Sequence, residues 1–353
     1  MPLADATQTP STGDRSSAQK RARAAEGAVR VVAPARLHLG FLDLNGGLGR
    51  RFGSIGLAID QPRTELTLAR SPTSIADGPD SKRALAALDR FVAALSLDKS
   101  YRIDIQSAIP PHCGLGSGTQ LALAVGSALT VLEGLDHSPA SLGELVDRGA
   151  RSAIGMASFK DGGFIVDGGR GPEAKPPSIL MRTAFPEAWR ILLILDRRTA
   201  GVHGEAEAQV FAALPPLPET AAAHVCRLVL MQLAPGLIES HIGIFGSAVS
   251  EIQSIIGGHF AAAQGGPWTS AAVGRIAEAL KTAGAYGIGQ SSWGPTGFAF
   301  APTQEIADRL YESVIENARG EGLEILIGRG RNRGASVERI MNTNSESPEG
   351  GQP

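Results

Sequence analysis

A glycine-rich segment that runs directly into an apolar one constrains this chain more than any other feature. Residues 109–124 read IPPHCGLGSGTQLALA, with three glycines inside five positions. Glycines spaced so closely let backbone N–H groups turn toward one point, because no Cβ stands in the way. The helix that follows has unpaired N–H donors and partial positive charge at its start, which favours an anion. We therefore expect a phosphate or pyrophosphate to be bound by Gly114, Leu115, Gly116, Ser117, Gly118 and Thr119.

The common phosphate-binding motifs do not describe this loop. A Walker A loop ends in Gly-Lys-Ser/Thr, which this segment lacks, and a dinucleotide fingerprint needs an acidic residue ~20 positions later in a βαβ unit. The simplest alternative is a tight strand-to-helix turn that binds no ligand. Glycine content alone leaves both interpretations open.

Composition narrows the class of protein. The chain has 353 residues, enough for two domains, and its 43% of hydrophobic and 19% of charged residues are typical of a globular protein. A net charge of −2 argues against a broad nucleic-acid-binding surface. Cys113 and Cys226 lie far apart, which fits a reducing compartment without a disulfide framework. No metal is assigned to the histidines that lack ligand spacing, His203, His224, His241 and His259.

Both ends of the chain are predicted to be disordered. Residues 1–28 are rich in Ala, Ser, Thr, Arg and Gln and have no apolar stretch like that of a signal peptide. Residues 342–353 form a Ser/Glu/Gly/Pro tail. Because no run approaches the ~18 apolar residues of a membrane span, we expect a cytoplasmic protein that does not enter a membrane.

Between these ends, hydrophobic periodicity predicts an α+β chain with two domains. The Gly/Pro-rich link 168–177 suggests a division into residues 29–172 and 173–341. Residues 121–132 are apolar almost all round, which predicts a fully buried helix. Strands are expected near residues 29–41, 55–59, 64–68, 101–105, 163–166, 190–195, 286–288, 298–300 and 323–327, and further helices near 85–95, 238–256, 272–283 and 305–318.

Two further segments make a ligand-free turn less attractive. Residues 34–40 read PARLHLG, a strand in which Arg36, His38 and Gly40 project from one face. Residues 289–297 read GQSSWGPTG, a second loop of small residues late in the other domain.

Together with residues 110–124, these segments resemble the three signature segments of the galactokinase–homoserine kinase–mevalonate kinase superfamily, in the same order. Within it, the RLHLG segment followed by Asp43, the RSAIG segment at 151–155, GGFIVDGG at 162–169 and QSSWGPTG at 290–297 resemble the β-ribofuranosylaminobenzene 5′-phosphate synthase family. The resemblance spans most of the folded chain, roughly residues 29–300.

The resemblance implies a fold, an activity and partners. The expected fold is an N-terminal α/β domain with the phosphate loop and a ferredoxin-like C-terminal domain, with the site between them. The implied reaction condenses phosphoribosyl pyrophosphate with 4-hydroxybenzoate or 4-aminobenzoate and releases carbon dioxide and pyrophosphate. It opens the biosynthesis of the tetrahydromethanopterin type of one-carbon carrier. Mg²⁺ is the expected cofactor and a homodimer is the expected assembly. Helix 236–256 either forms the dimer interface or is buried within its own two-layer domain.

Roles for particular residues follow from this chemistry. We expect Arg36 to bind an anionic group and His38 and Asp43 to orient or deprotonate the acceptor's hydroxyl. Asp161 lies on a Gly-x-x-Ser-x-x-Asp frame where superfamily kinases carry their acid, and Ser117 is the candidate contact for the metal ion. The second domain is expected to cover the phosphates with Gln290, Ser291, Ser292 and Gly294.

Several of these residues have simpler interpretations. Asp43 can instead bond the backbone amides of its own turn. Arg148 and Arg151 share a helix face, as a ribose-phosphate clamp or as a solvated surface pair. Lys160 either serves phosphate or solvates its loop, and the loop at 290–294 is otherwise a glycine-permitted hairpin.

Three other functions remain as alternatives. The first is an ATP-dependent small-molecule kinase with the same fold and loop. The second is an ordinary phosphoribosyltransferase, whose loop needs two adjacent acids; here Arg197 follows Asp196, which argues against it. The third is a degenerate member that binds phosphometabolites or a partner without turnover, which the intact loop argues against.

Overall fold

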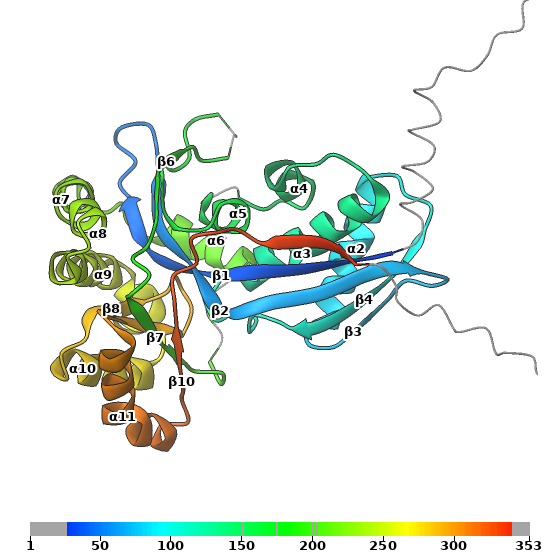
Figure 1. Ribbon diagram of the computed structural model, residues 1–353. Helices are drawn as coiled ribbons and strands as arrows, with labels where there is room; N and C mark the ends of the chain where they lie inside the picture. The colour runs from blue at the N-terminus through cyan, green and yellow to red at the C-terminus, as the bar shows by residue number, and fades with distance from the viewer. Residues whose placement is uncertain (1–26, 150–151, 174–175, 200, 202–203, 341–353) are drawn as a thin grey trace, which may run out of the picture.

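The computed structural model describes residues 27–149, 152–173, 176–199, 201 and 204–340, which form two sheets with their helices (Figure 1). The first sheet has the strand order β11-β1-β2-β4-β3, and β5 and then β6 extend it from another part of β2. Its strands are antiparallel except for the pair β3 and β4. The strands are β1 (Ala28–Asp43), β2 (Phe52–Ser71), β3 (Ile75–Asp77), β4 (Ser100–Ser107), β5 (Phe164–Asp167), β6 (Ile179–Thr183) and β11 (Ser336–Ile340).

The long hairpin of β1 and β2 connects the two halves of the molecule. Register shifts at Pro34/Ala35 and between His38 and Gly40 interrupt its ladder, and such bulges bend a strand. The first part of β1 packs in one core with α3 (Ser117–Glu133), and the later part packs in another core with α9 (Ile242–Gln264). The later part of β1 therefore lies where the two domains meet.

Helix α3 is the buried centre of the first domain. Its side chains from Leu121 to Leu132 are apolar or small, and nearly all of them are buried. The helix packs against β1, β2 and α2. The predicted fully buried helix is confirmed, because an element covered on all sides needs no polar face. The other helices here are α2 (Ser81–Ala94), α4 (Pro139–Leu145) and α5 (Ile154–Lys160).

The second sheet has the order β10-β7-β9-β8 with antiparallel neighbours, which is the βαββαβ arrangement of a ferredoxin-like domain. In Figure 1, α10 and α11 lie on one side of this sheet and α9 on the other. Covering both faces explains why β7 is a continuous apolar run rather than an alternating one. The elements are β7 (Arg190–Leu195), α6 (Gly204–Ala213), α7 (Glu219–Leu228), the π-helical turn η1 (Val229–Leu233), α8 (Ala234–Ile238), α9, α10 (Ala271–Thr282), β8 (Tyr286–Gln290), β9 (Gly297–Ala301), α11 (Gln304–Gly320) and β10 (Glu324–Gly328).

The sheet topology revises the division expected at residue 172. Strand β6 pairs with β5, and β11 returns from the end of the described chain to pair with β1, so both belong to the first sheet. The second domain is therefore an insertion between these two strands. The ends expected to be disordered, 1–28 and 342–353, lie almost entirely outside the described residues.

The helix expected over 238–256 also differs. Ile238 ends α8, Ser240 has a left-handed φ of 56°, and α9 begins only at Ile242. The apolar face of α9 is buried inside this chain, against β1 and the second sheet. The stretch before it, Glu219–Ile238, is long and apolar enough to cross a membrane by length and composition alone. Of its apolar 18-residue window 44% is buried, and core helices of soluble proteins pass the same test.

Candidate active site

Two glycine loops, one from each domain, touch each other directly. Gly114 has a φ of 84°, and a Cβ there would stand 2.1 Å from the carbonyl oxygen of Ser291. A Cβ on Gly294 would stand 2.1 Å from the carbonyl oxygen of Cys113. Neither position has room for a side chain, so the glycines allow the loop before α3 and the loop between β8 and β9 to pack backbone against backbone.

A hydrogen-bond network centred on the carbonyl oxygen of Gly114 holds the two loops and β1 together. Arg36 Nη1 donates to that oxygen at 2.6 Å, and Ser291 Oγ donates to it at 2.8 Å. The backbone N–H of His38 donates to Ser291 Oγ at 3.0 Å, and the N–H of Ser292 donates to the His38 carbonyl at 3.3 Å. Arg36, His38 and Ser291, three of the residues expected at the site, are thus brought together.

These elements border a cleft of about 480 Å³, large enough for a metabolite-sized ligand. Its chemical character is basic, since three arginines line it and Asp147 supplies the acidic side chain among the described lining residues. The lining residues that carry functional groups or loop backbone are Arg36, His38, Arg83, His112, Gly114, Gly116, Ser117, Gly118, Thr119, Asp147, Arg148, Ser152, Ser292, Trp293 and Gly294.

His38 is a buried residue that lines this cleft. Its side chain is only 3% exposed, and burial, followed by the nearby charge of Arg36, lowers its pKa to about 3. The imidazole is therefore neutral near pH 7 and is a weak base. It can orient a bound group, but it is poorly suited to remove a proton.

An aromatic cluster lies beside His38. The Phe41 ring is 4.6 Å from the imidazole, centroid to centroid, and Trp293 is 4.2 Å from Phe260 and 5.4 Å from Phe211. Trp293 is 2% exposed, and its Nε1 has no hydrogen-bond partner within the described residues. A buried donor without a partner costs free energy, so a ligand acceptor reaching this donor would gain by satisfying it.

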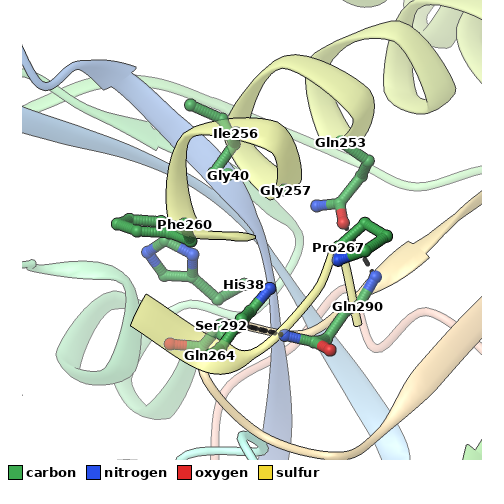
Figure 2. Close-up of a pocket in the computed structure, with 10 residues that line it drawn as sticks. All are labelled: His38, Gly40, Gln253, Ile256, Gly257, Phe260, Gln264, Pro267, Gln290 and Ser292. Atoms are coloured by element: carbon green, nitrogen blue, oxygen red, sulfur yellow. Dashed lines mark hydrogen bonds between the residues drawn. The ribbon is translucent and has the colours of Figure 1, made fainter. Parts of the chain in front are cut away.

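A second, much smaller pocket of about 30 Å³ adjoins the first and shares His38 and Ser292 with it (Figure 2). That volume suits roughly two water molecules rather than an aromatic ring. Gln290 lines this small pocket, not the cleft; its Oε1 accepts from Thr269 N at 2.6 Å and its Nε2 donates to Ser292 O at 3.0 Å. Gln290 was expected to cover the phosphates. In the structure it shapes the loop that carries Ser292 and does not line the larger cleft.

Two expected catalytic acids lie outside the cleft. Asp43 ends β1, and its Oδ1 accepts from the backbone N–H groups of Asn45 and Gly46 at 2.6 and 2.9 Å. Asp43 thus bonds the backbone amides of its own turn, which was the simpler of the two interpretations of this residue. Asp161 caps the far end of α5 and is 45% exposed beside Lys160. Ser152, which precedes α5, is the residue of this region that borders the cleft.

Sequence reasoning missed Arg83, His112 and Ser152, and weighed Arg148 only as one of two possibilities. Arg83 lies on α2, and its Nη2 is 3.5 Å from Ser117 Oγ. No local motif marks it, because its role depends on how α2 packs on α3. Arg151, named with Arg148 from the sequence, lies outside the described residues.

Asp167 holds the wall that carries Ser152. Its carboxylate is completely buried, and burial raises its pKa. Oδ1 accepts from the N–H groups of Ser54 and Gly169 at 3.0 and 2.9 Å, and Oδ2 accepts from Ala153 N and Ser152 Oγ at 2.9 and 3.1 Å. Four donors thus converge on a carboxylate that fixes the chain entering α5.

The cleft offers few ligands to a resident metal ion. Within the described residues, no group of three or more His, Cys, Asp or Glu side chains converges. The oxygen donors near the loop are the hydroxyls of Ser117 and Thr119 and the carboxylate of Asp147, which is 2.8 Å from Arg90 Nη2. Mg²⁺ commonly uses one or two carboxylates plus substrate phosphates. This donor set fits a Mg²⁺ ion carried mainly by phosphate oxygens of a ligand.

The fold and loop together define a class of protein. Family models match here under the descriptions GHMP kinases N terminal domain, over residues 82–169, and GHMP kinases C terminal, over residues 233–320. A homoserine kinase from Cytophaga hutchinsonii superposes with a TM-score of 0.59 at 18% identity, covering 89% of this chain and 98% of that one. Mevalonate kinase of L. major, in complex with R-mevalonate, gives a TM-score of 0.65 at 15% identity, covering 86% and 96%. The chain has the GHMP kinase fold.

Sequence relatives are more specific. A β-ribofuranosylphenol 5′-phosphate synthase from Methanothermobacter thermautotrophicus is 33% identical over 327 residues, 86% of this chain and 97% of that protein. A protein of the same name from Archaeoglobus fulgidus is 31% identical over 328 residues, 88% and 99% of the two chains. This chain belongs to the β-ribofuranosylphenol 5′-phosphate synthase family and is an enzyme, as the sequence motifs predicted.

Proposed function

We propose that this enzyme transfers a phosphoribosyl group from phosphoribosyl pyrophosphate to 4-hydroxybenzoate, with loss of carbon dioxide and pyrophosphate. The observation that carries the proposal is the make-up of one cleft, in which arginines and a glycine loop lie next to Trp293 and its ring cluster. A phosphorylated donor and an aromatic acceptor need those two surfaces side by side. The relatives' name refers to a phenol, and removing the carboxylate from 4-hydroxybenzoate leaves a phenol, which favours this acid over 4-aminobenzoate.

The proposed reaction makes one bond and breaks two. The ring carbon that bears the carboxylate attacks C1 of the ribose, while the bond from C1 to the pyrophosphate oxygen breaks. The bond from that ring carbon to the carboxyl carbon then breaks, its electrons restore the aromatic ring, and carbon dioxide leaves. The para oxygen donates electron density to the attacking carbon and receives it back, so no electron-sink cofactor is required. We extend the proposal to a first step in forming a tetrahydromethanopterin-type carrier.

Negative charge that develops on the leaving pyrophosphate is the main demand on the protein. We assign its stabilisation to the N–H groups at the start of α3 and to Arg36, which is already fixed by its bond to Gly114. Such preorganised donors need little rearrangement when the charge appears. Mg²⁺ held by the phosphate oxygens would neutralise further charge, and Ser117, whose hydroxyl lines the cleft, is the candidate side-chain ligand for it.

His38 is assigned an orienting role in this scheme. A neutral imidazole with a pKa of about 3 is a poor acceptor for a phenolic proton. Its position between the arginines and the aromatic cluster instead suits holding the acceptor ring against C1 of the ribose.

An ATP-dependent kinase of the same fold is the alternative. In the Gly-x-x-Ser-x-x-Asp motif of the superfamily kinases, the catalytic acid of such a kinase would be Asp161. That side chain follows the end of α5 and does not line the cleft. The carboxylate that does line the cleft in the described chain, Asp147, is paired with Arg90. This arrangement favours transfer that needs no carboxylate base.

The test is an assay of the purified full chain with phosphoribosyl pyrophosphate, Mg²⁺ and carboxyl-labelled 4-hydroxybenzoate. We expect labelled carbon dioxide and pyrophosphate in equal amounts, and only when both substrates are present. Labelled 4-aminobenzoate in a parallel reaction compares the two acids. Absence of both products, together with ATP consumption on small alcohols or acids, would instead establish the kinase.

A further inference from the structure

Two guanidinium groups converge on one residue of α3. A Cβ on Gly118 would lie 3.0 Å from Arg83 Nη2 and 3.4 Å from Arg148 Nη2. Arg83 comes from α2, and Arg148 follows α4, so different elements bring the two groups to the start of α3. Both arginines line the cleft.

The third arginine of the cleft lies on the other side of the loop. A Cβ on Gly116 would be 2.9 Å from Cγ and 3.3 Å from Nε of Arg36. Arg36 therefore faces Gly116 and the carbonyl of Gly114, whereas the other pair faces Gly118. The cleft thus has two separate cationic positions, the pair Arg83 and Arg148 and the single Arg36. The first residues of α3 lie between them.

The pair at Gly118 is only partly neutralised. Arg83 has an ion pair with Asp80 at 3.1 Å. Within the described residues, the Arg148 guanidinium makes no hydrogen bond and no ion pair, and the neighbouring Asp147 is engaged by Arg90 at 2.8 Å. Burial lowers the pKa of Arg148, and the nearby charges of Arg83 and Arg90 lower it further. An anion bound between Arg83 and Arg148 would relieve this repulsion.

We propose that Arg83 and Arg148 form a second anion subsite, which binds the 5′-phosphate of the phosphoribosyl donor while the glycine loop and Arg36 bind its pyrophosphate. The inference rests on the proposed function, because it names which end of that donor each subsite takes. A phosphate monoester carries close to two negative charges and three acceptor oxygens, and guanidinium forks bind such groups with paired, directional hydrogen bonds. The cleft of about 480 Å³ has room for a ligand with a phosphate at each end.

Binding of two simple probes to the full chain tests the assignment. Ribose 5-phosphate and inorganic pyrophosphate are titrated separately by calorimetry into wild type, Arg148→Gln and Arg90→Gln. Arg90 is the matched control, because it lies beside the pair but does not line the cleft. We expect Arg148→Gln to weaken ribose 5-phosphate binding about 10- to 100-fold, the loss typical of a charged hydrogen bond, and to leave pyrophosphate binding nearly unchanged. Arg90→Gln should change neither by more than a few-fold.

Several outcomes would overturn the second subsite. Equal weakening of both probes, no weakening of ribose 5-phosphate, or the same loss in Arg90→Gln would each do so, as would binding of plain ribose as tight as that of its phosphate. A thermal melt of each variant separates lost binding from lost folding. Arg83→Gln provides a second variant with the same expected pattern.

The two proposals can fail separately. If the labelled-carboxylate assay succeeds but Arg148→Gln leaves the KM for phosphoribosyl pyrophosphate unchanged, the subsite is wrong and the function stands. If that assay fails while Arg148→Gln still discriminates between the two probes, the subsite stands as a site for a phosphate monoester and the proposed reaction falls.

Discussion

The hydroxyl of Ser291 donates a 2.8 Å hydrogen bond to the carbonyl oxygen of Gly114, and this bond joins the loop of the ferredoxin-like domain to the phosphate loop of the first domain. The same oxygen accepts from Arg36, so one backbone atom links both loops and the first β-strand. The cleft is therefore not a property of either domain alone. Changes that separate the loops should disable the site even where they leave both domains folded.

Gly294→Ala tests this coupling. The new Cβ would lie 2.1 Å from the Cys113 carbonyl oxygen, and because that atom is backbone, one loop must move. A displacement of about 1 Å at a catalytic site can cost roughly 100-fold, so we expect a loss of that order in kcat/KM for phosphoribosyl pyrophosphate. Steady-state kinetics measures it.

Gly258→Ala is the matched control for that variant. Gly258 lies within α9, and a Cβ there would meet nothing within 4 Å. Alanine inside a helix should stabilise the chain by about 0.5–1 kcal/mol and leave activity unchanged. If Gly294→Ala kept full activity as well, the contact between the loops would not matter for catalysis.

His38 should make stability depend on pH. Its folded pKa of about 3 lies below its ordinary value of 6.5, so below pH 6.5 the unfolded chain binds a proton that the folded chain does not. Stability contributed by the neutral imidazole is thus present above pH 6.5 and falls with decreasing pH, by about 1.4 kcal/mol per unit until the folded pKa is reached. Urea unfolding of wild type and His38→Asn at pH 7.5, 6 and 5 should give a shallower pH dependence for the variant.

His224→Asn is the control for that measurement, because His224 is exposed and pairs with Glu251 on the surface. Its pH dependence between pH 6.5 and 5 should stay steeper than that of His38→Asn. Identical slopes in wild type and His38→Asn would show that His38 is not held neutral.

Trp293→Phe should separate ligand binding from folding. The substitution removes the buried Nε1–H, which has no partner in the described chain, and keeps most of the ring packing. We expect unchanged or slightly higher stability. A buried donor without a partner costs about 1–3 kcal/mol, and the substitution removes that cost. The KM for 4-hydroxybenzoate should rise about 5- to 10-fold, equivalent to one neutral hydrogen bond, while the KM for phosphoribosyl pyrophosphate stays the same. Trp268→Phe, outside the cleft, should change neither constant.

Asp167→Asn should be strongly destabilising. The amide would turn an N–H₂ group toward some of the four donors that now meet a carboxylate, in a position with no exposed surface. A loss of about 2–4 kcal/mol in the free energy of unfolding is expected. Asp104→Asn, at an exposed surface pair, should cost less than about 1 kcal/mol. A small effect at Asp167 would mean that the chain entering α5 is held by other contacts.

The parts of the fold that the sequence predicted are those with a local cause. The buried runs of α3 and β7 and the glycine loop carry their signal within a short stretch of chain. Strand β6 does not, because Ile179 and Leu180 are exposed and give no alternation. Strand β11 is short, largely polar and paired with β1 at the opposite end of the described chain, so only the folded topology reveals it.

The site follows the same division. Arg36, His38 and the glycine loop occupy short recognisable segments, and the structure brings them together with Ser291. Arg83 and Arg148 could not be assigned from the sequence, because their meeting point at Gly118 is created by packing of α2 and the segment after α4 on α3. The role of Asp43 could not be decided from the sequence, because an aspartate beside glycines is expected both in a turn, where it bonds backbone amides, and in a catalytic site. The structure shows the turn.

Substitution of Asp43 or Asp161 should have little effect on kcat. Neither side chain lines the cleft, so Asp43→Asn and Asp161→Ala should each retain kcat within about two-fold, a change well under 1 kcal/mol in the barrier. Asp43→Ala should in addition lose about 0.5–2 kcal/mol of stability, because the N–H groups of Asn45 and Gly46 lose their acceptor, whereas Asp43→Asn keeps an oxygen there. Steady-state rates at saturating substrates, with urea unfolding of the same preparations, distinguish the two roles. A drop in kcat of about a hundred-fold or more in Asp43→Asn, without loss of stability, would return this residue to the chemistry and require the loop after β1 to close over the bound substrates.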